Sequence, residues 1–265
     1  MLKTVAALGV GSLTGLAVHG YAYARNGLEV SHTDLALAGL PPEVDGFRVA
    51  LLTDFHRSET VPRSMLDDAV DAALVAQSDL IVLGGDYVTW GDRTFVDDAA
   101  EALARLTATH GVVAVLGNHD DDRDTPRALG RHGIAVLRDE RTTIAVRGAH
   151  LELVGIRYWT RKPRTIAQVL KGSTGFPVLL AHDPRRLDTA AALGFRLALS
   201  GHTHGGQVVV PGIGPLAARK FPVVAGVGRR GPTTMYVSRG VGTVYLPFRI
   251  NCPPEVSVVT LRREA

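Results

Sequence analysis

An apolar run ends in a pair of histidines within the stretch Leu197-Ala-Leu-Ser-Gly201-His202-Thr203-His204-Gly205-Gly206-Gln207. The run has the pattern of a buried strand, and the glycines after it predict a tight turn. Residues two apart in an extended segment point the same way, so His202 and His204 are placed to reach one metal ion or two neighbouring ions. Taken alone, the stretch also fits a polar loop with two solvated histidines, and the rest of the chain decides between these interpretations.

Four further apolar runs are followed directly by metal-binding types of side chain, and they span residues 47–53, 79–84, 112–116 and 177–181. Helical patterns at 61–77 and 95–109 alternate with the first three runs. We therefore expect an α/β fold with parallel strands, whose ligands gather beyond the carboxyl ends of the strands. The side chains at those ends are, in chain order, Asp54, His56, Asp86, Asn118, His182, His202 and His204.

Weaker patterns complete the chain. Short strands are predicted at 133–137, 142–146, 151–155, 207–210, 234–238 and 256–261, and a helix is predicted near 165–171. Residues 26–46 are interpreted as a lead-in of mixed polarity, interrupted at Pro41-Pro42.

The seven strand-end side chains form a donor set of nitrogen and oxygen atoms that suits Mn, Fe, Zn or Co. Seven ligands are more than one such ion takes from a protein. Two divalent or trivalent ions that share a bridging carboxylate account for the number. Such a pair, with ions about 3.5 to 4 Å apart, promotes in-line attack on phosphoesters.

These residues resemble the calcineurin-like metallophosphoesterase superfamily, whose five motifs they match in order: Asp54-Phe-His56, Gly85-Asp86, Gly117-Asn-His-Asp120, His182 and Gly201-His-Thr-His204. Residues 200–207, 236–240 and 247–249 resemble its bacterial YkuE/YaeI-like, membrane-associated phosphodiesterase branch. The resemblance implies a four-layer α/β/β/α sandwich of two mixed sheets, with both metals at the sheet edges.

The resemblance also implies a role for each residue. The first ion is expected to bind Asp54, His56, Asp86 and His204, and the second ion to bind Asp86, Asn118, His182 and His202, with Asp86 bridging and manganese as the favoured metal. His119 matches the catalytic histidine, which contacts the phosphoryl group and protonates the leaving oxygen while a metal-bridging hydroxide attacks phosphorus. Thr89 replaces the carboxylate that orients this histidine in protein phosphatases, which argues against that activity. Asp120, Asp92 or a backbone carbonyl is left to orient it, so Asp120 joins His119 as a catalytic candidate.

Residues 1–25 are predicted to be an N-terminal targeting or membrane-anchor segment, followed by a metallophosphoesterase domain at 26–265. The stretch 4–24 carries no charged residue and is long enough to cross a bilayer or to serve as a signal peptide, with a packed helix as the third alternative. Lys3 and the amino terminus outweigh Arg25, which favours an extracytoplasmic domain over a cytoplasmic one.

The net charge of +3 is spread along the chain. The sequence has no dense basic run and no basic stretch interleaved with aromatic residues, so no nucleic-acid partner is expected, and a nucleic-acid nuclease is a disfavoured third possibility. The charge fits a phosphoester substrate or an anionic membrane surface. Cys252 is the single cysteine, so it forms no intramolecular disulfide, and it is expected to be buried. The sequence leaves the oligomeric state open.

The sequence therefore predicts a dimetal phosphoester hydrolase, most simply a phosphodiesterase. The alternatives are a lipid-linked pyrophosphate hydrolase of the UDP-2,3-diacylglucosamine type, which requires a cytoplasmic domain, and a non-catalytic metal-binding module. Arg57 is interpreted either as a phosphate contact or as an exposed arginine, and Arg249 either as a substrate contact or as part of a structural ion pair. Residues 211–224 are interpreted either as an amphipathic rim for a lipid-bearing substrate or as packed β-structure.

Overall fold

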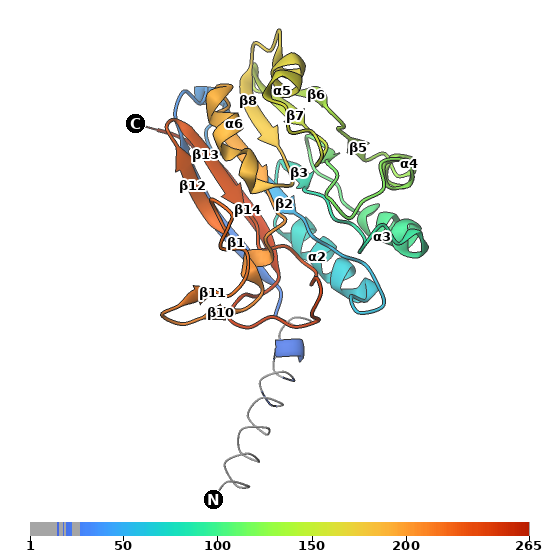
Figure 1. The fold of residues 1–265 in the computed structure, drawn as a ribbon. Helices are drawn as coiled ribbons and strands as arrows, with labels where there is room; N and C mark the ends of the chain where they lie inside the picture. The colour runs from blue at the N-terminus through green and yellow to red at the C-terminus, as the bar shows by residue number, and fades with distance from the viewer. Residues whose placement is uncertain (1–14, 16–17, 19, 23–26, 265) are drawn as a thin grey trace, which may run out of the picture.

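The computed structural model describes residues 15, 18, 20–22 and 27–264. Two six-stranded mixed sheets lie face to face, with helices on their outer faces (Figure 1). The strand orders are β1-β14-β2-β3-β4-β5 in the first sheet and β12-β13-β9-β8-β7-β6 in the second. The predicted four-layer α/β/β/α sandwich is confirmed.

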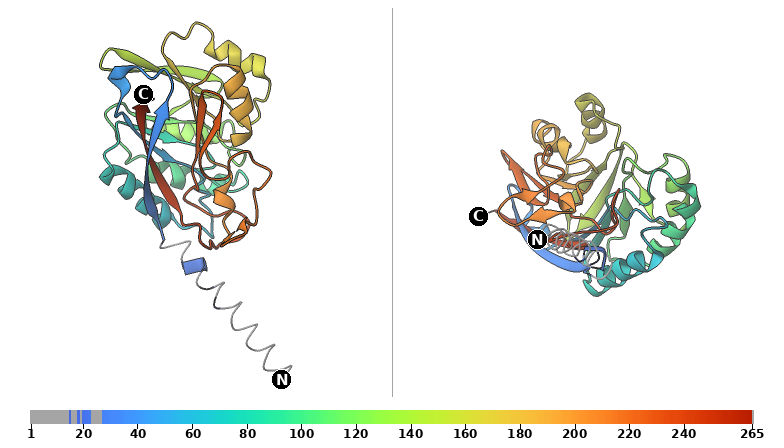
Figure 2. Two further views of the ribbon diagram at one scale, coloured as in Figure 1. Left: turned by 90° about the vertical axis from the view of Figure 1, so that its left-hand side faces the viewer. Right: turned by 60° about the horizontal axis from the view of Figure 1, so that its bottom comes forward.

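The first sheet consists of β1 (Glu29–Leu37), β2 (Arg48–Leu52), β3 (Leu80–Leu83), β4 (Val112–Ala114), β5 (Ala135–Val136) and β14 (Glu255–Arg263). The second consists of β6 (Glu140–Val146), β7 (Ala149–Gly155), β8 (Phe176–Leu180), β9 (Leu197–Ser200), β12 (Gly226–Arg230) and β13 (Thr233–Val237). The helices are α2 (Arg63–Val75), α3 (Val96–Leu103), α4 (Asp124–Arg131), α5 (Pro163–Leu170) and α6 (Leu187–Ala192). The hairpin of β10 (Val209–Val210) and β11 (Gly214–Pro215) lies at the same end of the molecule as residues 20–22 (Figure 2).

Three apolar layers hold the sandwich together. Helices α2, α3 and α4 pack on the first sheet through residues such as Leu66 and Leu103. The two sheets pack on each other through residues such as Leu51 and Leu199, and α5 and α6 cover the second sheet. Burial of this apolar surface is the main source of stability, and it fixes the positions of the strand ends.

Parallel pairing determines where those ends meet. In the first sheet β2, β3, β4 and β5 are parallel neighbours, and in the second β7, β8, β9 and β13 are. The loops after parallel strands leave the sheet at the same edge. The face-to-face packing of the sheets brings their two sets of loops together.

The sequence missed several elements. Residues 29–37 are not a lead-in but the edge strand β1, parallel to β14; its first half is largely exposed, so it lacks the apolar pattern of a buried strand. The helix predicted at 95–109 ends at Leu103. Thr107 and Thr109 follow, and β-branched residues favour helix less than alanine or leucine does. The short helices α4 and α6 were not predicted.

The expected targeting segment lies largely outside the described residues. Within the described part of the chain, no helix has both the length and the apolar character needed to cross a membrane.

Arg249 is neither a phosphate contact nor part of an ion pair in the described structure. Its side chain is fully buried and donates hydrogen bonds only to neutral partners, chiefly the carbonyl oxygens of Arg239, Gly240, Gly242, His204 and Cys252. Burial lowers the pKa of Arg249. The guanidinium therefore ties the loop after β13 to the histidine loop after β9.

We predict that Arg249→Lys lowers the free energy of unfolding by about 2 to 4 kcal/mol, because an ammonium group cannot reach all of these carbonyls and leaves buried acceptors without donors. Urea denaturation measures the change. The matched control is Arg164→Lys at an exposed position, expected to stay within about 0.5 kcal/mol. A stability loss no larger than that of the control would contradict the structural role of Arg249.

Candidate metal centre

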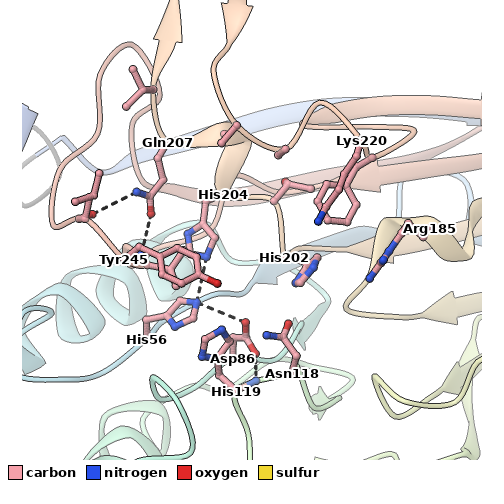
Figure 3. A pocket seen from close by; sticks show the side chains of 18 of the residues that line it. His56, Asp86, Asn118, His119, Arg185, His202, His204, Gln207, Lys220 and Tyr245 are labelled. Atoms are coloured by element: carbon pink, nitrogen blue, oxygen red, sulfur yellow. Dashed lines mark hydrogen bonds and ion pairs between the residues drawn. The ribbon is translucent and has the colours of Figure 1, made fainter.

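Loops from both sheets meet at one buried cluster (Figure 3). Asp54 and His56 follow β2, and Asp86 follows β3. Asn118 and His119 follow β4, and they complete the contribution of the first sheet. The second sheet contributes His182 after β8 and both His202 and His204 after β9. The structure thus brings together all seven sequence-predicted ligands.

Asp86 lies between two groups of potential ligands. Its Oδ2 is 3.5 Å from Nε2 of His56 and 3.1 Å from Nε2 of His182. On one side, Nε2 of His204 lies 3.1 Å from Nε2 of His56 and 3.4 Å from Oδ1 of Asp54. On the other side, Asp86, His182 and His202 bring donor atoms within 4.8 Å of one another. This is the arrangement expected of two ions with a shared carboxylate.

Two buried polar atoms are placed as metal ligands would be. Among the described residues, Oδ1 of Asn118 has no hydrogen-bond partner, and Nε2 of His182 has only the Asp86 carboxylate within hydrogen-bond distance, at 3.1 Å. Nδ1 of His182 lies 2.8 Å from the carbonyl oxygen of Gly84, which only accepts, so this nitrogen carries the proton. In neutral His182 the lone pair on Nε2 then faces Asp86, as a histidine ligand requires. The donor set therefore fits a pair of metal ions.

The backbone at the cluster is strained. Five of the seven candidate ligands have φ in the left-handed region that non-glycine residues rarely adopt, namely Asp54 (56°), His56 (50°), Asp86 (57°), His202 (74°) and His204 (51°). Each such residue costs on the order of 1 to 3 kcal/mol unless its surroundings compensate. Strain concentrated in this way is typical of a functional site.

Close approach of two loops requires glycine at Gly117. A Cβ at this position would overlap Oδ1 of Asp86, which accepts a 2.8 Å hydrogen bond from the backbone N–H of His119. Asp54 joins the two sheets in a similar manner, because its carboxylate oxygens accept from the backbone N–H of His202 at 3.0 and 2.9 Å. Both carboxylates are thereby fixed in position.

Burial controls the charge of the imidazoles. It lowers the pKa of His56 to about 3 and that of His202 to about 4, and it lowers the pKa of His204 well below its usual value. These three rings are therefore neutral near pH 7, the form that binds metal. Burial also acts to lower the pKa of His182, but the carboxylates of Asp86 and Asp54 raise it to about 10.

The carboxylates respond to the same surroundings. Burial, with a contribution from Asp86, raises the pKa of Asp54 to about 6. Burial also favours the neutral form of Asp86, but His182 and His56 hold the pKa of Asp86 well below its usual range. A metal ion binds the neutral imidazole, so binding at Nε2 of His182 competes with protonation of that ring.

His119 is oriented by a group that the sequence did not indicate. Its Nδ1 accepts a 2.9 Å hydrogen bond from the backbone N–H of Trp90, so the neutral ring carries its proton on Nε2. Burial lowers the pKa of His119, which also favours the neutral ring. The three orienting groups considered from the sequence, Asp120, Asp92 and a backbone carbonyl, are replaced by this amide. Every residue except proline has a backbone N–H, so the sequence cannot indicate which N–H donates to His119.

Asp120 instead supports the loops after β3 and β4. Its carboxylate accepts hydrogen bonds from the backbone N–H groups of Asp86 (2.7 Å), Tyr87 (2.8 Å) and Gly117 (2.8 Å). Burial and the nearby Asp86 raise the pKa of Asp120 to about 7, whereas the N–H donors of Gly117 and Tyr87 act to lower it. Arg57, the other arginine considered for phosphate binding, forms an ion pair with Asp98.

The sequence matches the Calcineurin-like phosphoesterase family over residues 47–206, a range that contains every candidate ligand. It is 33% identical to Phosphodiesterase YaeI of Escherichia coli (strain K12), over 81% of this chain and 82% of that protein. It is 30% identical to the uncharacterized metallophosphoesterase YkuE of Bacillus subtilis (strain 168), over 97% of this chain and 94% of that one.

The chain belongs to the calcineurin-like phosphoesterase family. It is a metal-dependent phosphoesterase of the branch that includes YaeI and YkuE. The solved structure of TT1561 from Thermus thermophilus shares the fold with a TM-score of 0.51 at 12% identity, over 72% of this chain and 88% of that chain. Members of the family use dinuclear metal sites, which agrees with the two groups of donors on either side of Asp86.

A cavity of about 850 Å³ opens from the phosphoesterase centre. One group of lining residues is mainly apolar and is called here the apolar wall: Val208, Leu216, Val244, Tyr245, Leu246 and Phe248. A second group combines aromatic rings with cations and is called here the cationic wall: Tyr158, Trp159, Arg161, Arg185, Lys220 and Phe221. Tyr158 and Trp159 follow the carboxyl end of β7, so the same strand-end signal that indicated His182 was present for them.

We predict that Asp120→Asn destabilises the protein by about 1 to 3 kcal/mol, because an amide offers one acceptor oxygen and turns its NH₂ group toward a backbone N–H. Urea denaturation measures the loss, and metal titration should show weaker binding because the Asp86 loop is less well held. The control is Asp122→Asn, whose side chain is 57% exposed. Equal stability of the two variants would show that the Asp120 contacts are not important.

Proposed function

We propose that the protein is a phosphodiesterase that uses two metal ions. In this proposal one ion binds Asp54, His56, Asp86 and His204, and the other binds Asp86, Asn118, His182 and His202. The observation that carries the proposal is the location of the Asp86 carboxylate, 3.5 Å from the His56 imidazole and 3.1 Å from that of His182. All these donors are nitrogen or oxygen atoms, which supports manganese, with iron, zinc and cobalt as alternatives.

The residues around the metals would each perform a separate task. When bound, the ions supply an activated water nucleophile and neutralise the negative charge that develops on the phosphoryl group. Asp54 and Asp86 offset the charge of the ions. His119 presents its Nε2–H toward the donor cluster, since Nδ1 is occupied by the Trp90 amide. We assign it a hydrogen bond to an oxygen of the phosphoryl or leaving group, which stabilises negative charge there.

Metal dependence is tested with bis(p-nitrophenyl) phosphate. We predict turnover with Mn²⁺, loss of turnover after chelation, and recovery when Mn²⁺ is restored. Asn118→Ala and His202→Ala should lose bound metal and activity together. Catalysis by protein that contains no metal, or full activity in these variants, would contradict the proposal.

The role of His119 is tested separately. We predict that His119→Ala retains bound metal while kcat falls by about 10²- to 10⁴-fold, the usual contribution of a positioned proton-bearing group. The fall should be larger for phenyl than for p-nitrophenyl leaving groups if the histidine serves the leaving oxygen. An equal fall for both would assign His119 to the other phosphoryl oxygens, and unchanged kcat would remove it from the mechanism.

The apolar wall of the cavity favours a lipid-bearing substrate. Part of this wall belongs to the 211–224 segment. Leu216 and Leu246 line the cavity yet are 57% and 53% exposed, and Ile213 nearby is 64% exposed. An exposed apolar group beside a polar site is typical of a surface that meets lipid. The segment is not uniform, because Val223 is buried in the core of the second sheet.

A lipid-linked pyrophosphate is the second candidate substrate, favoured by the same wall. Attachment to a membrane through residues 4–24, on the extracytoplasmic side, is part of the first proposal, whereas hydrolysis of a UDP-2,3-diacylglucosamine type of substrate requires the cytoplasmic side. The described residues 20–22 are joined to the cavity wall, because the N–H of Arg249, next to Phe248, donates to the carbonyl of Gly20 at 3.1 Å. An anchor at this end would hold the cavity near the bilayer.

We predict that Leu216→Ser combined with Leu246→Ser reduces kcat/KM for a phospholipid diester in mixed micelles at least about tenfold more than for bis(p-nitrophenyl) phosphate, because only the lipid loses apolar contact. Val75→Ser, at an 82% exposed position on α2, serves as the control and should change neither value. Equal losses on both substrates would contradict a lipid-binding wall.

A further inference from the structure

The cationic wall of the cavity carries more positive charge than the described structure neutralises. Arg161 and Lys220 line it, and neither forms an ion pair within the described residues. Arg185, also on this wall, pairs with Asp183 at 2.6 Å, but Asp183 is shared with Arg186 at 3.7 Å. Among the described residues that line the cavity, Asp86 is the single carboxylate, and it belongs to the metal centre.

Aromatic rings hold these cations beside the centre. The Arg161 guanidinium lies 5.3 Å from the Trp159 ring centroid, and the Lys220 ammonium lies 5.5 Å from that of Phe221. Phe221 in turn lies edge to face against His202, with centroids 5.1 Å apart. Cations next to aromatic faces keep their charge and are partly pre-positioned. Figure 3 shows Lys220 and Arg185 on the same side of the centre as His202 and Asn118.

We propose that Arg161, Lys220 and Arg185 form a subsite for a second phosphate group on the same substrate molecule, next to the phosphodiester that is cleaved. This inference rests on the proposed phosphodiesterase function and deepens it. Two divalent ions add four positive charges, which the carboxylates of Asp54 and Asp86, a hydroxide nucleophile and the single charge of a diester balance. The charges of Arg161 and Lys220 are then left in excess. A substrate with a further dianionic group neutralises more of that charge, and a guanidinium binds phosphate oxygens in pairs.

The test compares two chromogenic substrates that differ by one phosphate: thymidine 5′-(p-nitrophenyl phosphate) and the same compound with a 3′-phosphate. At low salt we expect the full-length enzyme with Mn²⁺ to prefer the 3′-phosphorylated substrate by roughly tenfold in kcat/KM, and the preference should shrink as salt is added. Lys220→Ala and Arg161→Ala should each reduce the preference by roughly threefold or more. Lys162→Ala and Arg164→Ala remove exposed cations outside the cavity lining, and they should keep it.

Each other outcome has a defined meaning. A wild-type preference near one, or a preference that survives both Lys220→Ala and Arg161→Ala, overturns the subsite while leaving the phosphodiesterase proposal intact. Equal losses on both substrates, together with weaker co-sedimentation with phosphatidylglycerol vesicles, would assign the cations to a membrane surface and also overturn it. If the wild type hydrolyses neither substrate, the phosphodiesterase proposal fails. The subsite is then tested without turnover, by calorimetric measurement of the affinities for thymidine 3′,5′-bisphosphate and thymidine 5′-phosphate. The ratio of the two affinities takes the place of the ratio of kcat/KM values, with the same expected preference and the same effect of the variants.

Discussion

The location of the Asp86 carboxylate between two groups of buried imidazoles is the constraint on which the site depends. The ligands around Asp86 come from loops of both sheets, so the site exists only when the sheets are packed face to face with their strand ends aligned. Burial keeps His56, His202 and His204 neutral. The carboxylates of Asp54 and Asp86 lie close together in the same buried cluster. Such a cluster is costly unless positive charge compensates it, and the two metal ions of the proposed site would supply that charge.

Hydrogen bonds to backbone groups hold the ligand loops in position. Asp120 holds the loops after β3 and β4 through their N–H groups, and Arg249 holds the histidine loop through carbonyl groups. The carbonyl of Gly84 fixes the tautomer of His182, and the amide of Trp90 fixes that of His119. These hydrogen bonds compensate the cost of the left-handed backbone conformation at the candidate ligands. They thereby fix the positions of the ligand side chains.

Strong local signals predicted parallel strands with ligands gathered at their ends, whereas the resemblance to the phosphoesterase family implied the four-layer sandwich. Apolar runs such as 79–84 identify buried strands, and polar residues at their ends identify the shared edge. The sequence did not predict β1, because an edge strand exposes polar side chains along much of its length. It also did not identify the partner of His119 or the role of Arg249, because both act through the backbone groups of distant residues. Residue types reveal which side chains are available, whereas such contacts require the folded chain.

The lining of the cavity bears on substrate selectivity. The metal centre accounts for phosphoester cleavage, while the apolar wall and the cationic wall are both part of the cavity lining. In the proposed phosphodiesterase, the groups attached to the two ester oxygens would decide which substrate is recognised, without any change in the residues at the metal centre.

The most direct test of the account is the anomalous scattering from a crystal of the full-length protein grown with Mn²⁺. We predict two peaks about 3.5 to 4 Å apart, with the Asp86 carboxylate between them. A single peak at saturating Mn²⁺, or two peaks that Asp86 does not bridge, would contradict it.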